Sequence, residues 1–268
     1  MTRQDMTGKE IRLRRIRDED SGNFVTIPMD HGVTIGPVQG LNHIHETIDE
    51  IGRGGGDSVL VHKGVVEHSF DKVQEDIGVI VHLNAATSVG PDPNNKVMVG
   101  DVKRAVRLGA DAVSVHINIG SETEPHQLQD LGEVADECDE YGMPLLAMTY
   151  VRGPDVDPND EETVAHATRL GAELGADVVK TSYTGNPDEY ERVIEGCPVP
   201  VVIAGGPKAE TKREVLRDIR DAMDVGARGV AMGRNVFQQE NVEGMTRAVS
   251  RVVHDGASVD EAMDEVRR

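Results

Sequence analysis

The feature that most constrains this chain is an alternation of short apolar segments with helical patterns. Eight such segments are rich in β-branched residues, and each is followed by a helical pattern or by a loop leading to one. The predicted strands span 23–29, 57–62, 77–83, 112–119, 143–150, 176–182, 200–204 and 230–232. Strict alternation predicts parallel β-α units. Eight units within 268 residues predict an α/β fold, a closed (β/α)8 TIM barrel.

The same pattern bounds the domain organisation. We expect residues 1–268 to form a single barrel domain, with a short N-terminal helical extension over about residues 1–20 that plugs or flanks it. The phrases LGADAV, LGADVV and VGARGV form a weak internal repeat at the turns from helix to strand. In each, a glycine can end the helix before the next strand begins. No GxGxxG follows the first strand, which disfavours a dinucleotide-binding fold.

Composition excludes several function classes. The 48 acidic residues outnumber the 28 basic ones and give a net charge of -20, so nucleic acid would be repelled. Few lysines and 3% aromatic residues suggest a halophilic archaeal cytoplasm, where salt screens the self-repulsion. No stretch approaches 18 apolar residues and the N-terminus is charged, so we expect a cytoplasmic protein outside the membrane. Cys138 and Cys197 form no CxxC pair, so neither a disulfide nor a thiolate metal site is indicated.

Polar residues gather at the carboxyl ends of the predicted strands, where barrel enzymes carry their catalytic groups. Lys180 ends the apolar run GADVVK. Burial there favours the neutral amine, which attacks carbonyl groups. The alternative is a lysine whose stem packs while its head reaches water. Lys63 is a rival nucleophile at the end of the second strand. The strand ends also supply His31, His62, His82, Asn84, His116, Asn118 and Arg152.

A lysine imine needs groups that move protons. Asp30 could accept and return the proton of a breaking or forming C–C bond, or it could simply cap the segment that follows. Tyr150 could donate a proton as the carbinolamine dehydrates, or it could be a tyrosine of the barrel rim. Together with Lys180, these residues predict covalent aldol chemistry in which the iminium is the electron sink.

Glycines at the last two strand ends predict a phosphate site. The runs AGGP at 204–207 and MGRN at 232–235 let backbone N–H groups approach an anion closely, and Arg234 can add a charge-assisted bond. The alternative is that these glycines only make tight turns. A divalent metal on His31, His62, His82 and His116 is a further alternative, which their spacing disfavours, so we predict no metal and no cofactor.

Long runs of the chain resemble the archaeal-type class I aldolase family. They are VTIPMDHGVTIGPVQGL, VLVHKG, ADAVSVHINIGS, MPLLAMTYVRG, HATRLGAELGADVVKTSYTG, PVVIAGGPK and GVAMGRNVFQ. The resemblance implies Lys180 as the imine lysine, Asp30 as proton acceptor and Tyr150 as proton donor. The implied substrate-binding residues are Asp30, His31, Gly32, Val33, Thr34, Tyr150, Val151, Arg152, Lys180, Gly205, Gly206, Gly233 and Arg234. Relatives often have Tyr-Pro-Arg-Gly where this chain has Tyr150-Val151-Arg152-Gly153, which loosens the backbone at the donor.

The resemblance also implies a reaction. A 1-deoxy-hexodiulose 6-phosphate would form a Schiff base and shed a three-carbon phosphate fragment. The remaining carbanion equivalent would add to L-aspartate 4-semialdehyde, forming an amino-dideoxy-heptulosonate early in a route to 3-dehydroquinate and the aromatic amino acids. The partners are therefore a phosphorylated sugar and a small aldehyde, and a homo-oligomer is expected. The alternatives are a class I fructose-bisphosphate aldolase, which needs a second phosphate site, and a non-catalytic sugar-phosphate sensor.

Overall fold

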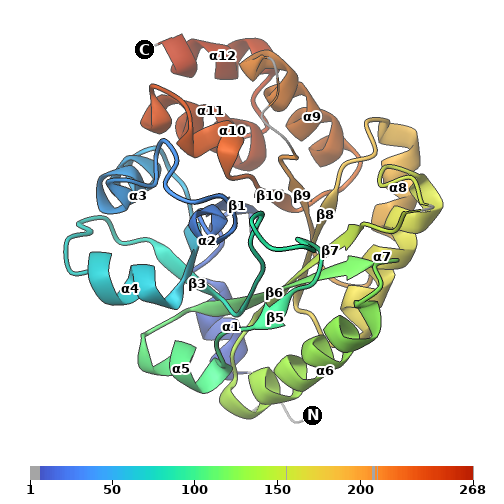
Figure 1. The fold of residues 1–268 in the computed structure, drawn as a ribbon. Helices are drawn as coiled ribbons and strands as arrows, with labels where there is room; N and C mark the ends of the chain where they lie inside the picture. The colour runs from blue at the N-terminus through green and yellow to red at the C-terminus, as the bar shows by residue number, and fades with distance from the viewer. Residues whose placement is uncertain (1–6, 155, 207–208, 210, 268) are drawn as a thin grey trace.

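A computed structural model describes residues 7–154, 156–206, 209 and 211–267 of the chain (Figure 1). Its centre is a closed barrel of parallel strands in the order β1-β10-β9-β8-β7-β6-β3-β2. The strands are β1 (Phe24–Pro28), β2 (Ser58–His62), β3 (Gly78–His82), β6 (Ala112–Ile119), β7 (Leu145–Val151), β8 (Val178–Ser182), β9 (Val201–Ala204) and β10 (Gly229–Ala231). The predicted (β/α)8 barrel is confirmed.

Helices surround the barrel (Figure 1). The longer ones are α3 (Ile44–Arg53), α6 (Glu124–Tyr141), α7 (Glu161–Glu173), α8 (Pro187–Glu195), α9 (Lys212–Asp224), α11 (Val242–His254) and α12 (Val259–Arg267), with α5 (Val102–Arg107) between β3 and β6. Side-chain caps fix several of their starts. Thr211 and Glu214 form a capping box at α9, and Asp160 accepts from the N–H of Thr163 at α7. Glu210, where the sequence predicted the start of α9, lies outside the described residues.

Short elements after the carboxyl ends of four strands were not predicted. They are α2 (His31–Ile35), α4 (Lys63–Ser69) and the antiparallel pair β4 (Asn84–Ala85) and β5 (Val97–Met98), together with α10 (Arg234–Phe237) after β10. Elements this short carry too few residues for a hydrophobic period to identify them. Two of them, α2 and the β4–β5 hairpin, were expected to be loops, and they change how the barrel mouth is covered.

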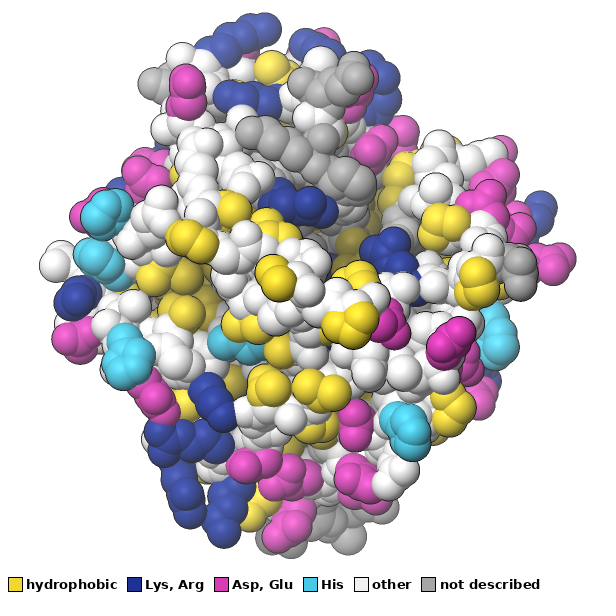
Figure 2. All heavy atoms as spheres, in the orientation of Figure 1, with side chains coloured by type: hydrophobic (Ala, Val, Ile, Leu, Met, Phe, Trp, Pro, Cys, Tyr) yellow, Lys and Arg dark blue, Asp and Glu magenta, His cyan; other side chains and the backbone are white. Residues whose placement is uncertain are grey.

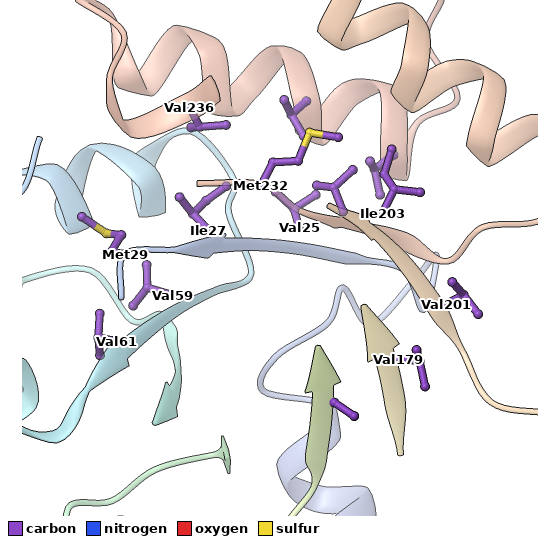
Figure 3. Packing of buried hydrophobic residues seen from close by; sticks show 14 of the residues in the cluster. Val25, Ile27, Met29, Val59, Val61, Val179, Val201, Ile203, Met232 and Val236 are labelled. Carbon is purple, nitrogen blue, oxygen red and sulfur yellow. The ribbon is translucent and has the colours of Figure 1, made fainter. Parts of the chain in front are cut away.

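Apolar side chains form two layers. One layer fills the space between barrel and helices, where Val25, Ile27 and Ile203 project from their strands toward the covering helices (Figure 3). The other fills the barrel itself with Phe24, Leu60, Ile80, Ala112, Leu146, Met148, Val178, Val202, Ala231 and Ile16. The interior is therefore a packed core rather than a pore.

Residues 7–16 close the amino end of the barrel. Ile16 is 1% exposed and belongs to the interior cluster. The helix α1 (Thr7–Leu13) is held by Lys9, whose Nζ lies 3.0 Å from Asp177. Arg15 Nε donates to Asp111 at 2.8 Å, and a side chain at Gly78 would meet the carbonyl of Arg15. Of the predicted extension over residues 1–20, residues 1–6 lie outside the described part, and residues 7–16 cover this end of the barrel.

Candidate active site

Strand register places polar side chains side by side at the carboxyl end of the barrel. We call Asp30, His82, His116, Tyr150 and Lys180 the polar ring. His116 of β6 is in register with Met148 of β7, and Met148 with Lys180 of β8. Alternate residues of a strand share a face, so Lys180 points to the same side as the interior residue Val178, and Tyr150 to the same side as Met148. The polar ring therefore lies directly above the apolar filling of the barrel, as the sequence predicts.

Lys180 is buried in this ring. Lys180 is only 6% exposed, and its Nζ lies 3.7 Å from the sulfur of Met148. The Nζ also lies 6.0 Å from the centroid of the Tyr150 ring. The alternative in which the lysine head reaches bulk water is wrong for this conformation. Among the described residues no carboxylate forms a salt bridge with this amine.

Asp30 faces the same ring from the end of β1. It occupies the N-cap position of α2 but makes no side-chain capping hydrogen bond. Its carboxylate lies 3.5 Å from His31 Nδ1 and 4.0 Å from His82 Nε2, and a fifth of the side chain (20%) stays exposed. Burial alone would raise the pKa of Asp30, but His82, His31, Lys180 and His62 together outweigh burial and lower it. A carboxylate that stays ionised suits a proton acceptor.

The histidines of the mouth are neutral near pH 7. Burial lowers the pKa of His82 to about 3, and it lowers that of His116 well below its usual value. A 2.8 Å hydrogen bond joins His82 Nδ1 to Ser114 Oγ, and a 2.9 Å bond joins His116 Nε2 to Asn118 Oδ1. Burial also lowers the pKa values of His31 and His62. Because these rings carry no charge near pH 7, they lower the pKa of Asp30 only at the acid pH where they become protonated, and Lys180 is the other group that lowers it.

Tyr150 connects the polar ring of the barrel mouth with the rim. Its ring meets that of His116 edge-on with centroids 4.9 Å apart, and the guanidinium carbon of Arg152 lies 5.3 Å from the tyrosine centroid. Val151 lies on the opposite face of β7 from Tyr150 and is buried, so its side chain is outside the mouth. Of the predicted trio at 150–152, only Tyr150 and Arg152 can offer side chains to a ligand.

The two glycine turns meet as the sequence predicts. Arg234 Nη2 donates to the carbonyl of Gly206 at 3.0 Å, and Asn235 Nδ2 donates to Gly205 at 2.6 Å. A Cβ at Gly233 would lie 2.4 Å from the carbonyl of Pro28, so only glycine fits. The Nε of Arg234 is buried without a hydrogen-bond partner among the described residues. Pro207 of the predicted AGGP run lies outside those residues.

The stretch His31 to Thr34 forms the first turns of α2 at the rim. Gly32 and Val33 are exposed there, with Val33 at 41%. The carbonyl of Thr34 accepts hydrogen bonds from the N–H and the Oγ of Ser88, at 2.9 and 2.8 Å. The backbone of this stretch therefore borders the mouth, while only the His31 side chain reaches the carboxylate of Asp30.

Lys63 does not belong to the ring. It begins α4, and its Nζ donates to the carbonyl of Val99. It lines a surface cavity of about 590 Å³ outside the barrel, together with Glu67, Val99, Gly100, Asp101, Lys103, Arg104 and Arg107. The role of rival nucleophile is therefore wrong for this lysine. The sequence missed this because it showed a strand end but not the helix that turns the side chain outward.

The metal alternative rests on four histidines at neighbouring strand ends. The rings of His62 and His82 do meet, with centroids 5.2 Å apart, while His116 bonds Asn118 and His31 packs on Phe237. Within the described residues, no group of three or more His, Cys, Asp or Glu is arranged to hold a metal ion. Cys138 and Cys197 are both free.

Sequence reasoning overlooked Lys96. This lysine immediately precedes β5 and is half-buried, and Asp30 and Arg152 are among the charges that act on it. The signal available was its place in the long loop after a strand that ends in His82. The β4–β5 hairpin was not predicted, so the sequence did not indicate that this loop folds back over the barrel.

Comparison with known proteins agrees with this geometry. The model of the DeoC/LacD family aldolase matches residues 24–239. The chain is 49% identical over 256 residues to a 2-amino-3,7-dideoxy-D-threo-hept-6-ulosonate synthase of Halobacterium salinarum, covering 96% of this chain and 95% of that protein. It is 40% identical to a 2-amino-4,5-dihydroxy-6-oxo-7-(phosphonooxy)heptanoate synthase of Streptomyces griseus, covering 93% and 92%.

Solved structures show the same fold. An archaeal fructose 1,6-bisphosphate aldolase superposes with a TM-score of 0.84 at 30% identity, over 93% of this chain and all of that one (100%). A Schiff base-forming fructose-1,6-bisphosphate aldolase, studied through its reaction intermediates, superposes at 0.83 with 30% identity, over 92% of this chain and 100% of its own. The chain belongs to the DeoC/LacD aldolase family.

Proposed function

We propose that this chain is a 2-amino-3,7-dideoxy-D-threo-hept-6-ulosonate synthase. It would join a three-carbon ketone fragment of a 1-deoxy-hexodiulose 6-phosphate to L-aspartate 4-semialdehyde, early in aromatic amino acid biosynthesis. The observation that carries the proposal is the buried Lys180, set beside Tyr150 and facing Asp30. The Halobacterium synthase named above, at 49% identity over nearly the whole chain, supports this choice of product.

The first half-reaction removes a fragment. The Nζ of Lys180 attacks the methyl-ketone carbonyl of the donor, and Tyr150 donates the proton with which the carbinolamine loses water. Asp30 then accepts the proton of the hydroxyl on the neighbouring fragment. The C–C bond breaks, its electron pair moves into the iminium to form an enamine, and a three-carbon aldehyde phosphate leaves.

The second half-reaction reverses these steps with a new aldehyde. The enamine carbon attacks the aldehyde carbon of the semialdehyde, and the protonated Asp30 returns its proton to the new alkoxide. Water then hydrolyses the iminium and frees Lys180. We propose that the N–H groups of Gly205, Gly206 and Gly233, with Arg234, bind the donor phosphate. Support comes from the close backbone approach at Gly233 and from the buried, unpaired Nε of Arg234.

The alternative function is a class I fructose-bisphosphate aldolase, favoured by the two solved aldolases of similar structure. Parallel assays separate the functions. One mixture contains the deoxy-diulose phosphate with L-aspartate 4-semialdehyde, and the other contains fructose 1,6-bisphosphate alone. We expect kcat/KM to be larger in the first assay. Cleavage of fructose 1,6-bisphosphate with no synthase product would establish the alternative.

We also propose the setting in which the enzyme works. A salt-rich archaeal cytoplasm is supported by the net charge of -20 and by the Halobacterium relative. None of the helices within the described ranges is long and apolar enough to cross a membrane. We propose a homo-oligomer of one barrel domain per chain, with residues 1–20 as its extension. Light scattering that gives the 29.0 kDa mass of one chain would contradict the oligomer.

A further inference from the structure

A hairpin lies across the mouth of the barrel. We call residues 84–98, which include β4 and β5, the mouth hairpin; it passes in front of the strands in Figure 1. At the centre of the same view, Figure 2 shows hydrophobic side chains interspersed with uncharged polar groups and backbone. On one side, Ser88 bonds the carbonyl of Thr34 in α2. On the other, the carbonyl of Asn94 accepts from Asn118 Nδ2 at 2.8 Å and Gln127 Nε2 at 2.9 Å. The hairpin thus spans from α2 to β6 and α6.

These anchors hold Lys96 at the mouth. Asn94 lies two residues before it, and Val97, the next residue, pairs with Ala85. Lys96 is half-buried, and its Nζ has no hydrogen-bond or ion-pair partner among the described residues. Burial lowers the pKa of Lys96, against the opposing charge of Asp30. Holding an ammonium away from water without a partner costs free energy, so a ligand that supplies the partner would bind favourably.

The mouth carries its positive charges in two groups. Burial lowers the pKa of His31 against the opposing charge of Asp30, and the charges of Lys180 and Arg234 lower it further. On the other side, Lys96 lies two residues after Asn94, which bonds Asn118 of β6, and β6 is four strands away from β10 in the eight-stranded barrel. Its charge acts on His62, His82 and His116. Arg234 is not among the charges that act on Lys96. The mouth therefore has one cationic group beside the glycine turns and a second one beside Tyr150.

Two separate cationic groups fit two separate anions. The glycine turns with Arg234 form the group proposed above for the phosphate. Opposite them, Lys96 and Arg152 offer flexible donors, while the carboxylates of Asp30 and Asp92 act on Lys96 without forming an ion pair with it among the described residues. The Streptomyces relative is named for a product with a carboxylate at one end and a phosphonooxy group at the other. A ligand of that kind matches charges at both ends of a mouth.

We propose that Lys96, together with Arg152, binds the carboxylate of the aldehyde acceptor. This assignment rests on the proposed synthase function, because a carboxylate-bearing aldehyde is the second substrate of that reaction. Lys96 would then be a specificity-determining residue that selects an acidic acceptor over a neutral one. It takes no part in forming the imine, so Lys180 chemistry should proceed without it.

The test is the variant Lys96→Gln, with Lys103→Gln as a matched control because Lys103 is an exposed lysine of α5 outside the mouth. Initial rates are measured with L-aspartate 4-semialdehyde and, separately, with the uncharged aldehyde propanal. We expect kcat/KM for the semialdehyde to fall about 10- to 100-fold in Lys96→Gln, since a charge-assisted bond is lost. The values for propanal, the KM for the phosphorylated donor and all values of Lys103→Gln should stay unchanged.

Three outcomes would overturn the assignment, and they differ from one another. An equal loss for both aldehydes would show a structural role for Lys96. A raised KM for the semialdehyde in Arg234→Gln, with none in Lys96→Gln, would place the carboxylate at the glycine turns after the phosphate fragment has left. A wild-type chain that cleaves fructose 1,6-bisphosphate and makes no product from the semialdehyde would remove the proposed function itself, and this inference with it.

Discussion

The two ends of the barrel use the same residue types for opposite purposes. At the amino end, each of three acids that precede a strand accepts a backbone N–H of the neighbouring strand. Asp57 accepts from Val25, Asp111 from Val79 and Asp177 from Leu145, at 2.6, 2.9 and 2.8 Å. A basic side chain also pairs with each of these carboxylates. His254 lies 3.3 Å from Asp57, Arg15 lies 2.8 Å from Asp111, and Lys9 lies 3.0 Å from Asp177.

At the carboxyl end several polar groups lack such partners. Lys180 contacts only the sulfur of Met148 among hydrogen-bond acceptors of the described chain, and His31 Nδ1 and Arg234 Nε are buried without hydrogen bonds. Unpaired polar groups cost stability, and paired ones cost little. The difference teaches that the amino end is built for folding and the carboxyl end for a ligand that completes its bonds.

The largest expected effect is at the imine lysine. Lys180→Met keeps an apolar stem of similar length in a 6% exposed position, so folding should persist. Without an amine no imine forms, and kcat should fall by at least about 1,000-fold. Stopped assays over hours measure the residual rate, and binding of the phosphorylated donor should remain. Near-wild-type turnover would contradict the assignment of the carboxyl end to chemistry.

Next in size are the proton-transfer groups. Asp30→Asn and Tyr150→Phe should each lower kcat by roughly 10²- to 10⁴-fold, because general acid–base catalysis contributes that much. Phe keeps the ring that contacts His116 and Arg152, so the melting temperature should change little. The measurement is kcat with calorimetry on the same samples. If a loss of thermal stability accounts for the lost activity, the contribution of these two residues is structural rather than catalytic.

The amino end should show the converse behaviour. Lys9→Met removes the partner of Asp177 and of Asp139, which lies 2.6 Å from the Lys9 Nζ. The expected cost is about 1–3 kcal/mol in the free energy of unfolding, with kcat unchanged. Urea unfolding measures it, with the exposed Lys72→Met as the control that should lie within about 0.5 kcal/mol of wild type. A selective loss of kcat in Lys9→Met would erase the distinction between the ends.

The smallest effects concern pH, and they have opposite signs at the two ends. Burial lowers the pKa of His82 to about 3, so the unfolded chain binds a proton first and stability falls as pH drops from about 6.5 toward 3. Burial alone would lower the pKa of His254 too, but Asp57 outweighs it and raises the pKa. Stability from His254 is therefore complete below about pH 6.5 and is lost as pH rises through the raised value.

Two variants separate these effects. Relative to wild type, His82→Gln should become more stable as pH falls, with a slope of at most about 1.4 kcal/mol per pH unit. By contrast, His254→Gln should be less stable than wild type at pH 6, and the gap should narrow by pH 8. Urea unfolding across pH 5–8 gives both curves. Slopes of the same sign in the two variants would show that the ends do not differ in this respect.

The sequence predicted the barrel and most of the ring for a physical reason. Long apolar runs ending in Asp30, His82, His116 and Lys180 have only one parallel arrangement that brings their ends together. It did not predict which way Lys63 turns or that Lys96 faces the mouth. Those orientations depend on the short helix α4 and the mouth hairpin, which are held by contacts far apart in the chain, such as Asn118 with Asn94.

The acids of the repeat LGADAV and LGADVV illustrate the same limit. The sequence explained the glycines as helix ends but gave no role to Asp111 and Asp177. Each bonds a strand N–H 32 residues away and a cation of the N-terminal segment. A contact between residues so far apart in the sequence forms only when the barrel closes, and no local sequence pattern encodes that closure.

The most direct test of the central claim is borohydride reduction in the presence of the phosphorylated donor, followed by peptide mass mapping, with and without a chelator. We predict an adduct on Lys180 that survives chelation, and none on Lys63 or Lys96. An adduct on another lysine, or no adduct together with activity that the chelator abolishes, would contradict the imine mechanism.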